Sequence, residues 1–247
     1  MTDPTTARQR AQGREETPAR RDDRSGAPRI IAIDGPSGAG KGTIARAVAS
    51  RLRYRHVDTG AMYRALAWKA LHDRTDLSDE AAMAALAAHA TFDVGDGRIR
   101  IDGHDVASAI RTPEIDMAAA VVARQAPVRD ALIARQRALG EGGGVVMEGR
   151  DIGTVVFPAA DVKIFLDASP EERARRRASD PSHSAGRGAA GMLDVATALA
   201  ERDRSDRTRA ASPLKQADDA VVIDTTGLSI DDVVERVMDV VGAATRG

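Results

Sequence analysis

The sequence contains no cysteine, and only six of its 247 residues are aromatic. Without cysteine the chain forms neither a disulfide nor a thiolate metal site, which is typical of a cytoplasmic protein. So few aromatic side chains argue against a protein that stacks the bases of single-stranded nucleic acid. No apolar run of about 18 residues is present and no apolar segment follows Met1, so we expect neither a membrane span nor a signal peptide.

The charges of the chain are nearly balanced, with a net charge of −1. This balance provides no general attraction to nucleic acid or to a membrane surface, and we expect the chain to bind neither. The five histidines are scattered and form no pair at helical spacing, so the composition predicts no metal site built from protein ligands alone.

The first 28 residues carry Thr, Arg, Asp, Glu, Gly and Pro with almost no apolar side chain. Such a segment cannot bury enough surface to offset the entropy lost on ordering, so we interpret 1–28 as a disordered tail. The remaining 29–247 are long enough for one domain with a substantial core.

A short apolar run, 30–33, leads into a glycine-rich turn and then into residues with helical spacing from Thr43 to Leu52. Strand, glycine-rich turn, lysine and helix in this order indicate the phosphate-binding loop of nucleoside triphosphate enzymes. The glycines let successive N–H groups point at phosphate oxygens, and the helix adds its positive N-terminal end. Lys41 supplies a mobile charge for the β- and γ-phosphates of ATP. The predicted nucleotide-binding residues are Gly35, Pro36, Ser37, Gly38, Ala39, Gly40, Lys41, Gly42 and Thr43.

The loop departs from the common pattern directly after Lys41, where Gly42 precedes the hydroxyl of Thr43. This spacing argues against direct ligation of Mg²⁺ by the hydroxyl, although we still expect Mg²⁺ to accompany ATP. The sequence Gly-Lys-Gly-Thr resembles that of nucleoside monophosphate kinases. The alternative is a glycine-rich turn that arose by chance.

A second motif, Asp58-Thr-Gly-Ala-Met-Tyr-Arg64, begins at the end of a predicted strand and enters a helix expected over 61–73. It resembles the acceptor-binding corner of cytidylate kinases. The resemblance implies that the Thr59 hydroxyl contacts the acceptor nucleotide and that Arg64 clamps its phosphate. The alternative for Arg64 is a solvated arginine on a helix.

Alternating apolar and polar residues around Gly95-Asp-Gly97 predict a hairpin or a three-stranded sheet. Bacterial cytidylate kinases carry a similar insert on the acceptor side, which here spans about 90–112. Helices expected over 113–123 and 126–139 follow, and the resemblance assigns Arg129 on the second helix to the base. The chain has Ala120 where the family commonly has a serine that contacts cytosine.

Gly144-Val-Val-Met-Glu-Gly-Arg-Asp151 predicts a buried strand that ends in Arg150 and Asp151. Ligands of open parallel sheets bind at the carboxyl ends of the strands. A guanidinium suits a phosphate or the acceptor edge of a pyrimidine, and a carboxylate accepts from the exocyclic amine of cytosine. Uracil has an oxygen there, so the pair favours cytosine. The alternative is an ion pair between Arg150 and Asp151 themselves.

Residues of about 178–192 are mostly Pro, Ser, Gly and Ala, a composition typical of a mobile lid. One arginine-rich segment precedes this predicted lid and another follows it. Before it, Arg173 and Arg177 either form a solvated face or point at the donor phosphates. After it, Glu201-Arg-Asp-x-x-Asp-x-x-Arg209 is similar to the lid-closing segment of cytidylate kinases. That match implies that Arg202 reaches the transferring phosphoryl group, Asp206 the ribose hydroxyls and Arg209 the acceptor phosphate.

Alternating strands and helices predict an α/β fold: a P-loop three-layer structure with a five-stranded parallel sheet, the acceptor-side insert and the lid. The resemblance to bacterial cytidylate kinases covers about residues 29–242. It implies transfer of the γ-phosphoryl group of ATP to CMP or dCMP, a step of pyrimidine nucleotide metabolism, in a monomer. The catalytic residues are then Lys41, Arg150, Arg202 and Arg209, and the acceptor is bound by Thr59, Arg64, Arg129, Arg150, Asp151, Asp206 and Arg209.

Three alternatives remain open. The first is a nucleoside monophosphate kinase for another acceptor, such as a UMP/CMP kinase or one for AMP. The second is a P-loop GTPase, but the chain lacks an Asn-Lys-x-Asp guanine motif. The third is a nucleotide-binding module without catalysis, which would not need the arginines of the acceptor side.

Overall fold

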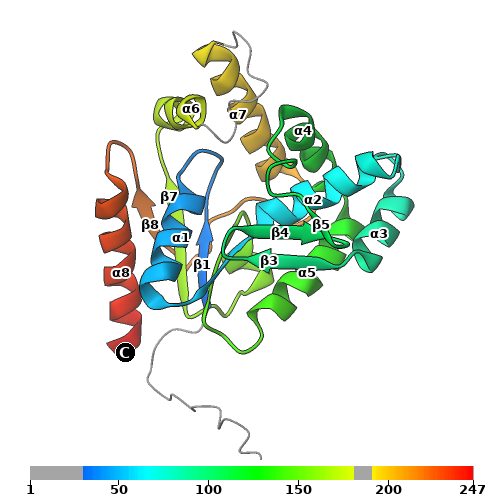
Figure 1. Ribbon diagram of the computed structural model, residues 1–247. Coiled ribbons are helices and arrows are strands. Elements are labelled where there is room, and N and C mark those ends of the chain that lie inside the picture. The colour runs from blue at the N-terminus through cyan, green and yellow to red at the C-terminus, as the bar shows by residue number, and fades with distance from the viewer. Residues whose placement is uncertain (1–29, 181–190, 247) are drawn as a thin grey trace, which may run out of the picture.

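The centre of the molecule is a sheet of five parallel strands in the order β2-β6-β1-β7-β8 (Figure 1). The computed structural model describes residues 30–180 and 191–246, so the predicted tail over 1–28 and most of the predicted lid over 178–192 lie outside the described residues. The strands are β1 (Ile30–Asp34), β2 (Arg55–Asp58), β6 (Val145–Gly149), β7 (Val162–Asp167) and β8 (Val221–Asp224). The predicted five-stranded parallel sheet is confirmed.

Successive residues of the central strand point to opposite faces of the sheet, and each face has its own core. Ile31 and Ile33 belong to the core beneath α1 (Lys41–Leu52) and α8 (Ile230–Arg246). Ala32 belongs to the larger core on the other face, which includes side chains of α2 (Thr59–His72), α3 (Glu80–His89), α4 (Pro113–Val122) and α5 (Ala126–Gly140). Because helices cover both faces, the strands are continuous apolar runs rather than alternating ones.

The acceptor-side insert is a small antiparallel sheet of β3 (Phe92–Gly95), β4 (Arg98–Ile101) and β5 (His104–Asp105). Val94, Ile99 and Ile101 are buried and belong to the larger core. The insert is therefore part of the domain, as its small size requires, and its strands fall within the predicted range of 90–112.

The parallel register brings the carboxyl ends of three adjacent strands to one level. Asp34 of β1 lies opposite Gly149 of β6, and Asp58 of β2 lies opposite Glu148. Helices α6 (Pro170–Ser179) and α7 (Met192–Thr208) lie beyond this edge (Figure 1). Helix α7 includes most of the charged segment over 201–209, so the polar residues of that segment lie at helical spacing.

A π-helix, η1 (Ile152–Val156), follows β6 and is not indicated by the sequence pattern. Its first two N–H groups, from Ile152 and Gly153, each donate to the carboxylate of Asp34 at 2.8 Å. Burial raises the pKa of Asp34 to about 6, although these two hydrogen bonds oppose the change. Asp34 thereby ties the end of the central strand to the turn that carries Arg150 and Asp151.

Candidate active site

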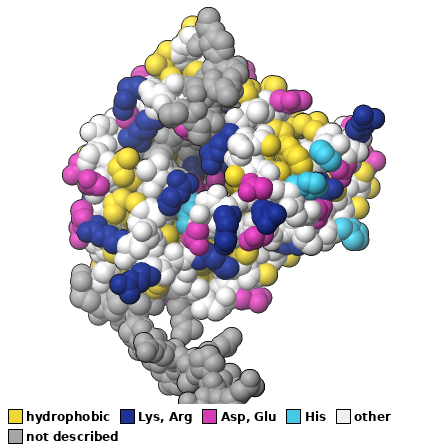
Figure 2. All heavy atoms as spheres, in the orientation of Figure 1, with side chains coloured by type: hydrophobic (Ala, Val, Ile, Leu, Met, Phe, Trp, Pro, Cys, Tyr) yellow, Lys and Arg dark blue, Asp and Glu magenta, His cyan; other side chains and the backbone are white. Residues whose placement is uncertain are grey.

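A cavity of about 1040 Å³ opens at the carboxyl ends of the strands. Its lining includes the loop after β1, the turn after β6 and residues of α1, α2, α4, α5, α6, α7 and α8. Figure 2 shows Lys and Arg side chains on both sides of the depression in this face. Lys41 and ten arginines line the cavity, namely Arg46, Arg64, Arg111, Arg129, Arg150, Arg175, Arg176, Arg177, Arg202 and Arg209. A cavity of this charge suits a ligand with several phosphate groups.

The glycine-rich loop has the tight path that a phosphate-binding loop requires. Gly35 and Gly38 adopt φ angles of 148° and 80°, which side chains rarely adopt. A Cβ atom on Gly35 would lie 2.0 Å from the Leu166 carbonyl oxygen, and one on Gly38 would lie 2.9 Å from Cβ of Arg173. Residues 37–43 line the cavity, whereas Gly35 and Pro36 form the turn behind it.

Lys41 is the first residue of α1 and is 7% exposed. Its Nζ donates to the Pro36 carbonyl oxygen at 2.7 Å, which folds the side chain back over the loop. Burial and the nearby Arg150 lower the pKa of Lys41 to about 7, while Glu148 and Asp34 act in the opposite direction. A phosphate anion beside Nζ would favour the charged ammonium, so ligand binding and protonation of Lys41 are coupled.

Arg173 supports the phosphate-binding loop from behind. Its guanidinium donates to the carbonyl oxygens of Ser37 at 3.1 Å and Ala168 at 3.2 Å and pairs with Asp203. The other carboxylate oxygen of Asp203 accepts the Ser37 N–H at 3.2 Å. Arg173 therefore holds the loop and does not line the cavity, unlike Arg177, which does.

The residues of the second motif, which we predicted to bind the acceptor, lie at the start of α2. Asp58 caps the helix by accepting the Ala61 N–H at 2.9 Å, and its other oxygen pairs with Arg64 at 3.0 Å. Burial opposes ionisation of Asp58, but Arg64 and the Ala61 N–H lower its pKa. The buried Nε of Arg64 has no hydrogen-bond partner within 30–180 and 191–246, so this guanidinium keeps a donor for a ligand. The Thr59 hydroxyl donates to the Glu148 carbonyl oxygen at 2.7 Å.

Arg150 and Asp151 do not pair with each other. Arg150 donates to Asp206 of α7 at 2.8 Å, and Asp151 contacts the guanidinium of Arg129 at 2.5 Å and that of Arg209 at 3.5 Å. Arg129 is 1% exposed and Arg209 is 8% exposed. Asp151 thus contacts two buried cations at one end of the cavity, and Arg209 also lies 3.6 Å from the carboxylate of Asp206.

Apart from Gly35 and Pro36, the predicted site residues line this one cavity. All seven predicted acceptor residues line it, and so do the four predicted catalytic residues and Ala120. Sequence reasoning missed Tyr63, whose ring lies 5.4 Å from the Arg129 guanidinium, and assigned no role to Glu148. Only their positions in the sequence could have indicated these two residues. Tyr63 directly precedes Arg64 in the second motif, and Glu148 lies near the end of a strand, two residues before Arg150.

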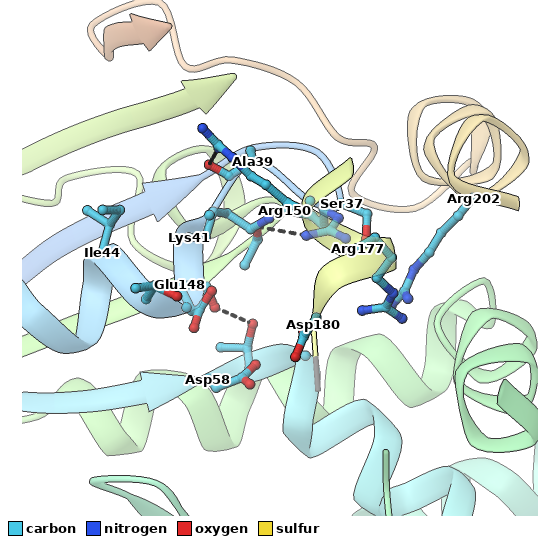
Figure 3. Close-up of a pocket in the computed structure, with 18 of the residues that line it drawn as sticks. Ser37, Ala39, Lys41, Ile44, Asp58, Glu148, Arg150, Arg177, Asp180 and Arg202 are labelled. Atoms are coloured by element: carbon cyan, nitrogen blue, oxygen red, sulfur yellow. Dashed lines mark hydrogen bonds between the residues drawn. The ribbon is translucent and has the colours of Figure 1, made fainter. Parts of the chain in front are cut away.

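Glu148 is buried at the base of the cavity beside the start of α1 (Figure 3). One carboxylate oxygen lies 3.1 Å from the imidazole Nε2 of His56, which is 3% exposed. The same oxygen lies 3.1 Å from where a Cβ of Gly42 would stand. Gly42 therefore leaves room for the carboxylate, which explains why glycine directly follows the loop lysine here.

The described residues contain no group of three or more His, Asp or Glu side chains that could hold a metal ion by themselves. Mg²⁺ does not require such a group, since it commonly keeps several waters and binds through one or two carboxylates and the phosphates of its substrate. Glu148 beside the loop fits that mode.

No helix within residues 30–180 and 191–246 is long and apolar enough to cross a membrane.

A sequence profile described as cytidylate kinase matches residues 31–243 of this chain. The chain belongs to the cytidylate kinase family. Among curated relatives it is 50% identical over 212 residues to the cytidylate kinase of Solibacter usitatus (strain Ellin6076), a match covering 86% of this chain and 91% of that protein. It is 47% identical over 216 residues to the cytidylate kinase of Geobacillus sp. (strain WCH70), covering 85% of this chain and 95% of that protein.

Among solved structures, shikimate kinase from Bacteroides thetaiotaomicron superposes with a TM-score of 0.49 at 12% identity, covering 86% of this chain and 98% of that chain. The activity of this cytidylate kinase family enzyme is the phosphorylation of CMP or dCMP with ATP.

Proposed function

We propose that the cavity holds ATP and CMP or dCMP together, with ATP on the glycine-rich loop and the acceptor between α2, α5 and α7. The observation that carries this proposal is the single cavity that joins residues 37–43 to Arg64, Arg129 and Asp151. The loop N–H groups and the N-terminus of α1 favour the phosphates of ATP. Two phosphate-bearing ligands in one cavity suit direct transfer between them.

On the acceptor side, Arg64 binds the phosphate of CMP and the Arg129–Asp151 pair binds the base. Asp151 is an acceptor held by Arg129 and Arg209, so it is oriented for the exocyclic amine of cytosine and repels the oxygen of uracil. Asp206, which Arg150 holds, accepts from the ribose hydroxyls. Ala120 lines the same cavity without a hydroxyl, so Asp151 is the main determinant of base choice in this chain.

The acceptor phosphate oxygen attacks the γ-phosphorus of ATP in line with the departing β-phosphate oxygen. A new P–O bond forms to the acceptor, the bond to ADP breaks, and its electron pair stays on ADP. The attacking oxygen is already ionised at neutral pH, so no strong general base is required. Catalysis then consists of positioning and charge stabilisation by Lys41, Arg150, Arg202 and Arg209.

Mg²⁺ would enter with ATP and neutralise part of the phosphate charge. Glu148 is the carboxylate that would hold it through bound water, and His56 fixes the orientation of that carboxylate. Glu148 also offsets the positive charge at Lys41.

Binding and turnover measurements on three variants test these roles. Arg64→Ala is expected to weaken CMP binding in calorimetric titrations while leaving ATP binding unchanged. Arg202→Ala is expected to reduce kcat about 10²- to 10³-fold with both ligands still bound. Arg204→Ala, an exposed position on the same helix α7, serves as the control and should change neither. Equal loss of ATP and CMP binding in Arg64→Ala would refute its assignment to the acceptor side.

A further inference from the structure

Asp116 on α4 contacts two arginines that reach it from two other helices. Arg177 of α6 donates to one carboxylate oxygen of Asp116, and Arg202 of α7 approaches the other at 3.4 Å. The side chains of all three residues are largely shielded, with exposures of 16% for Asp116, 22% for Arg177 and 23% for Arg202. A single carboxylate therefore joins α4 to α6 and α7, three helices that all contribute to the lining of the cavity.

The two guanidiniums lie close together, and Figure 3 shows Arg177 and Arg202 converging from their separate helices. Both arginines line the cavity. Burial and the neighbouring Arg150 lower the pKa of Arg202, and Asp116 is the first group that opposes this effect. Burial also lowers the pKa of Arg177, and Asp116 again opposes it. Without Asp116, like charges would drive these two side chains apart and out towards solvent.

We propose that Asp116 is a positioning residue for phosphoryl transfer, which holds Arg202 in the orientation that reaches the transferring group. This inference rests on the role of Arg202 proposed above. Asp116 accepts from two guanidiniums with separate oxygens, so it fixes where they lie as well as neutralising them. Asp116 belongs to α4, whose Ala119 and Ala120 line the same cavity. The position of Arg202 is therefore fixed relative to a helix that also borders the proposed acceptor site.

An acidic residue at the start of α4 also stabilises the helix, and this effect can be separated from the positioning of Arg202. Asp116 and Glu114 both lie in the first turn of α4, where negative charge favours the helix. Glu114 is exposed, and its substitution removes the same charge from the same turn. Glu114→Ala is therefore the matched control for Asp116→Ala.

The test compares kcat, the KM values for ATP and CMP, and the melting temperature across the variants. Asp116→Ala is expected to lower kcat about tenfold while each KM changes less than about threefold, because misplacing Arg202 weakens an interaction made mainly in the transition state. Asp116→Glu should recover most of this loss. Asp116→Asn keeps the shape of the side chain and should show the same kcat loss if the alanine variant does not fold.

A double-mutant comparison shows whether Asp116 acts through Arg202. In the Arg202→Ala background, Asp116→Ala should cause no further loss of kcat. The inference is overturned if Asp116→Ala is as active as Glu114→Ala, or if its effect is the same with and without Arg202. A normal kcat in Arg202→Ala alone would refute the role of Arg202 itself, whereas a loss there and none in Asp116→Ala refutes only the inference.

Discussion

Replacing Lys41 with methionine should abolish activity and at the same time stabilise the folded protein at low pH. Methionine fills nearly the same volume as the lysine stem but carries no charge. The pKa of Lys41 falls from 10.5 to about 7 in the folded protein, which corresponds to a cost of at most ~5 kcal/mol for the buried ammonium. Removing this charge removes that cost, but the variant also loses the hydrogen bond to the Pro36 carbonyl oxygen, which offsets about 1–3 kcal/mol of the stabilisation. We therefore expect Lys41→Met to be more stable by about 2–4 kcal/mol at pH 6.

The sign of the pH dependence follows from proton binding in the two states. Between pH 7 and 10.5 the unfolded chain binds a proton at Lys41 that the folded protein does not, so wild-type stability from this group rises with pH. Methionine has no such dependence. The advantage of Lys41→Met should therefore be largest at or below pH 6 and should shrink by roughly 3 kcal/mol at pH 9, where the two proteins become about equally stable.

Urea unfolding at pH 6 and pH 9 measures this difference through the fluorescence of Trp68, the only tryptophan in the chain. Lys215→Met is the control, because the Lys215 side chain is 70% exposed and should show no pH-dependent effect. Turnover of Lys41→Met should fall by about 10²-fold or more. A variant that is less stable than the wild type at pH 6, or a stability difference independent of pH, would refute the reasoning about the buried charge.

Substitutions at two further positions, Gly35 and Asp151, have expected outcomes. Gly35→Ala should prevent folding or destabilise the protein by more than about 3 kcal/mol in chemical unfolding, because its Cβ would overlap the Leu166 carbonyl oxygen and the backbone φ is positive. Asp151→Ala should cost about 3–5 kcal/mol of unfolding free energy, since it leaves Arg129 buried without a counter-charge and leaves Arg209 with Asp206 alone. Asp151→Asn should keep most of the activity with CMP at elevated KM and lower the CMP to UMP preference in the turnover assay, and an unchanged preference would contradict its role in base choice.

The sheet, the insert and the order of the motifs could be predicted from the sequence because they depend on local signals. Ile30 to Ile33 had to be buried on both faces, and Gly95 and Gly97 marked the turn of the insert. Helix α7 includes most of the charged segment over 201–209, because charged residues there pair with neighbouring elements rather than ending the helix.

The partners of the charged residues could not be predicted, since they depend on how distant elements meet. Arg150 and Asp151 are adjacent in sequence yet pair with different residues, because the turn after β6 sends their side chains apart. The pairing of Glu148 with His56 depends on the register of β6 and β2. The π-helix η1 depends on Asp34, a residue more than a hundred positions earlier in the chain.

The most direct test of the account is ADP formation from ATP and Mg²⁺ in a coupled assay, with CMP, dCMP, UMP, AMP and GMP supplied one at a time. We expect strong turnover with CMP and dCMP and weak turnover with the other three. Comparable turnover with UMP would contradict the assignment of Asp151 to cytosine. No acceptor-dependent turnover with CMP or dCMP would contradict phosphoryl transfer in this cavity.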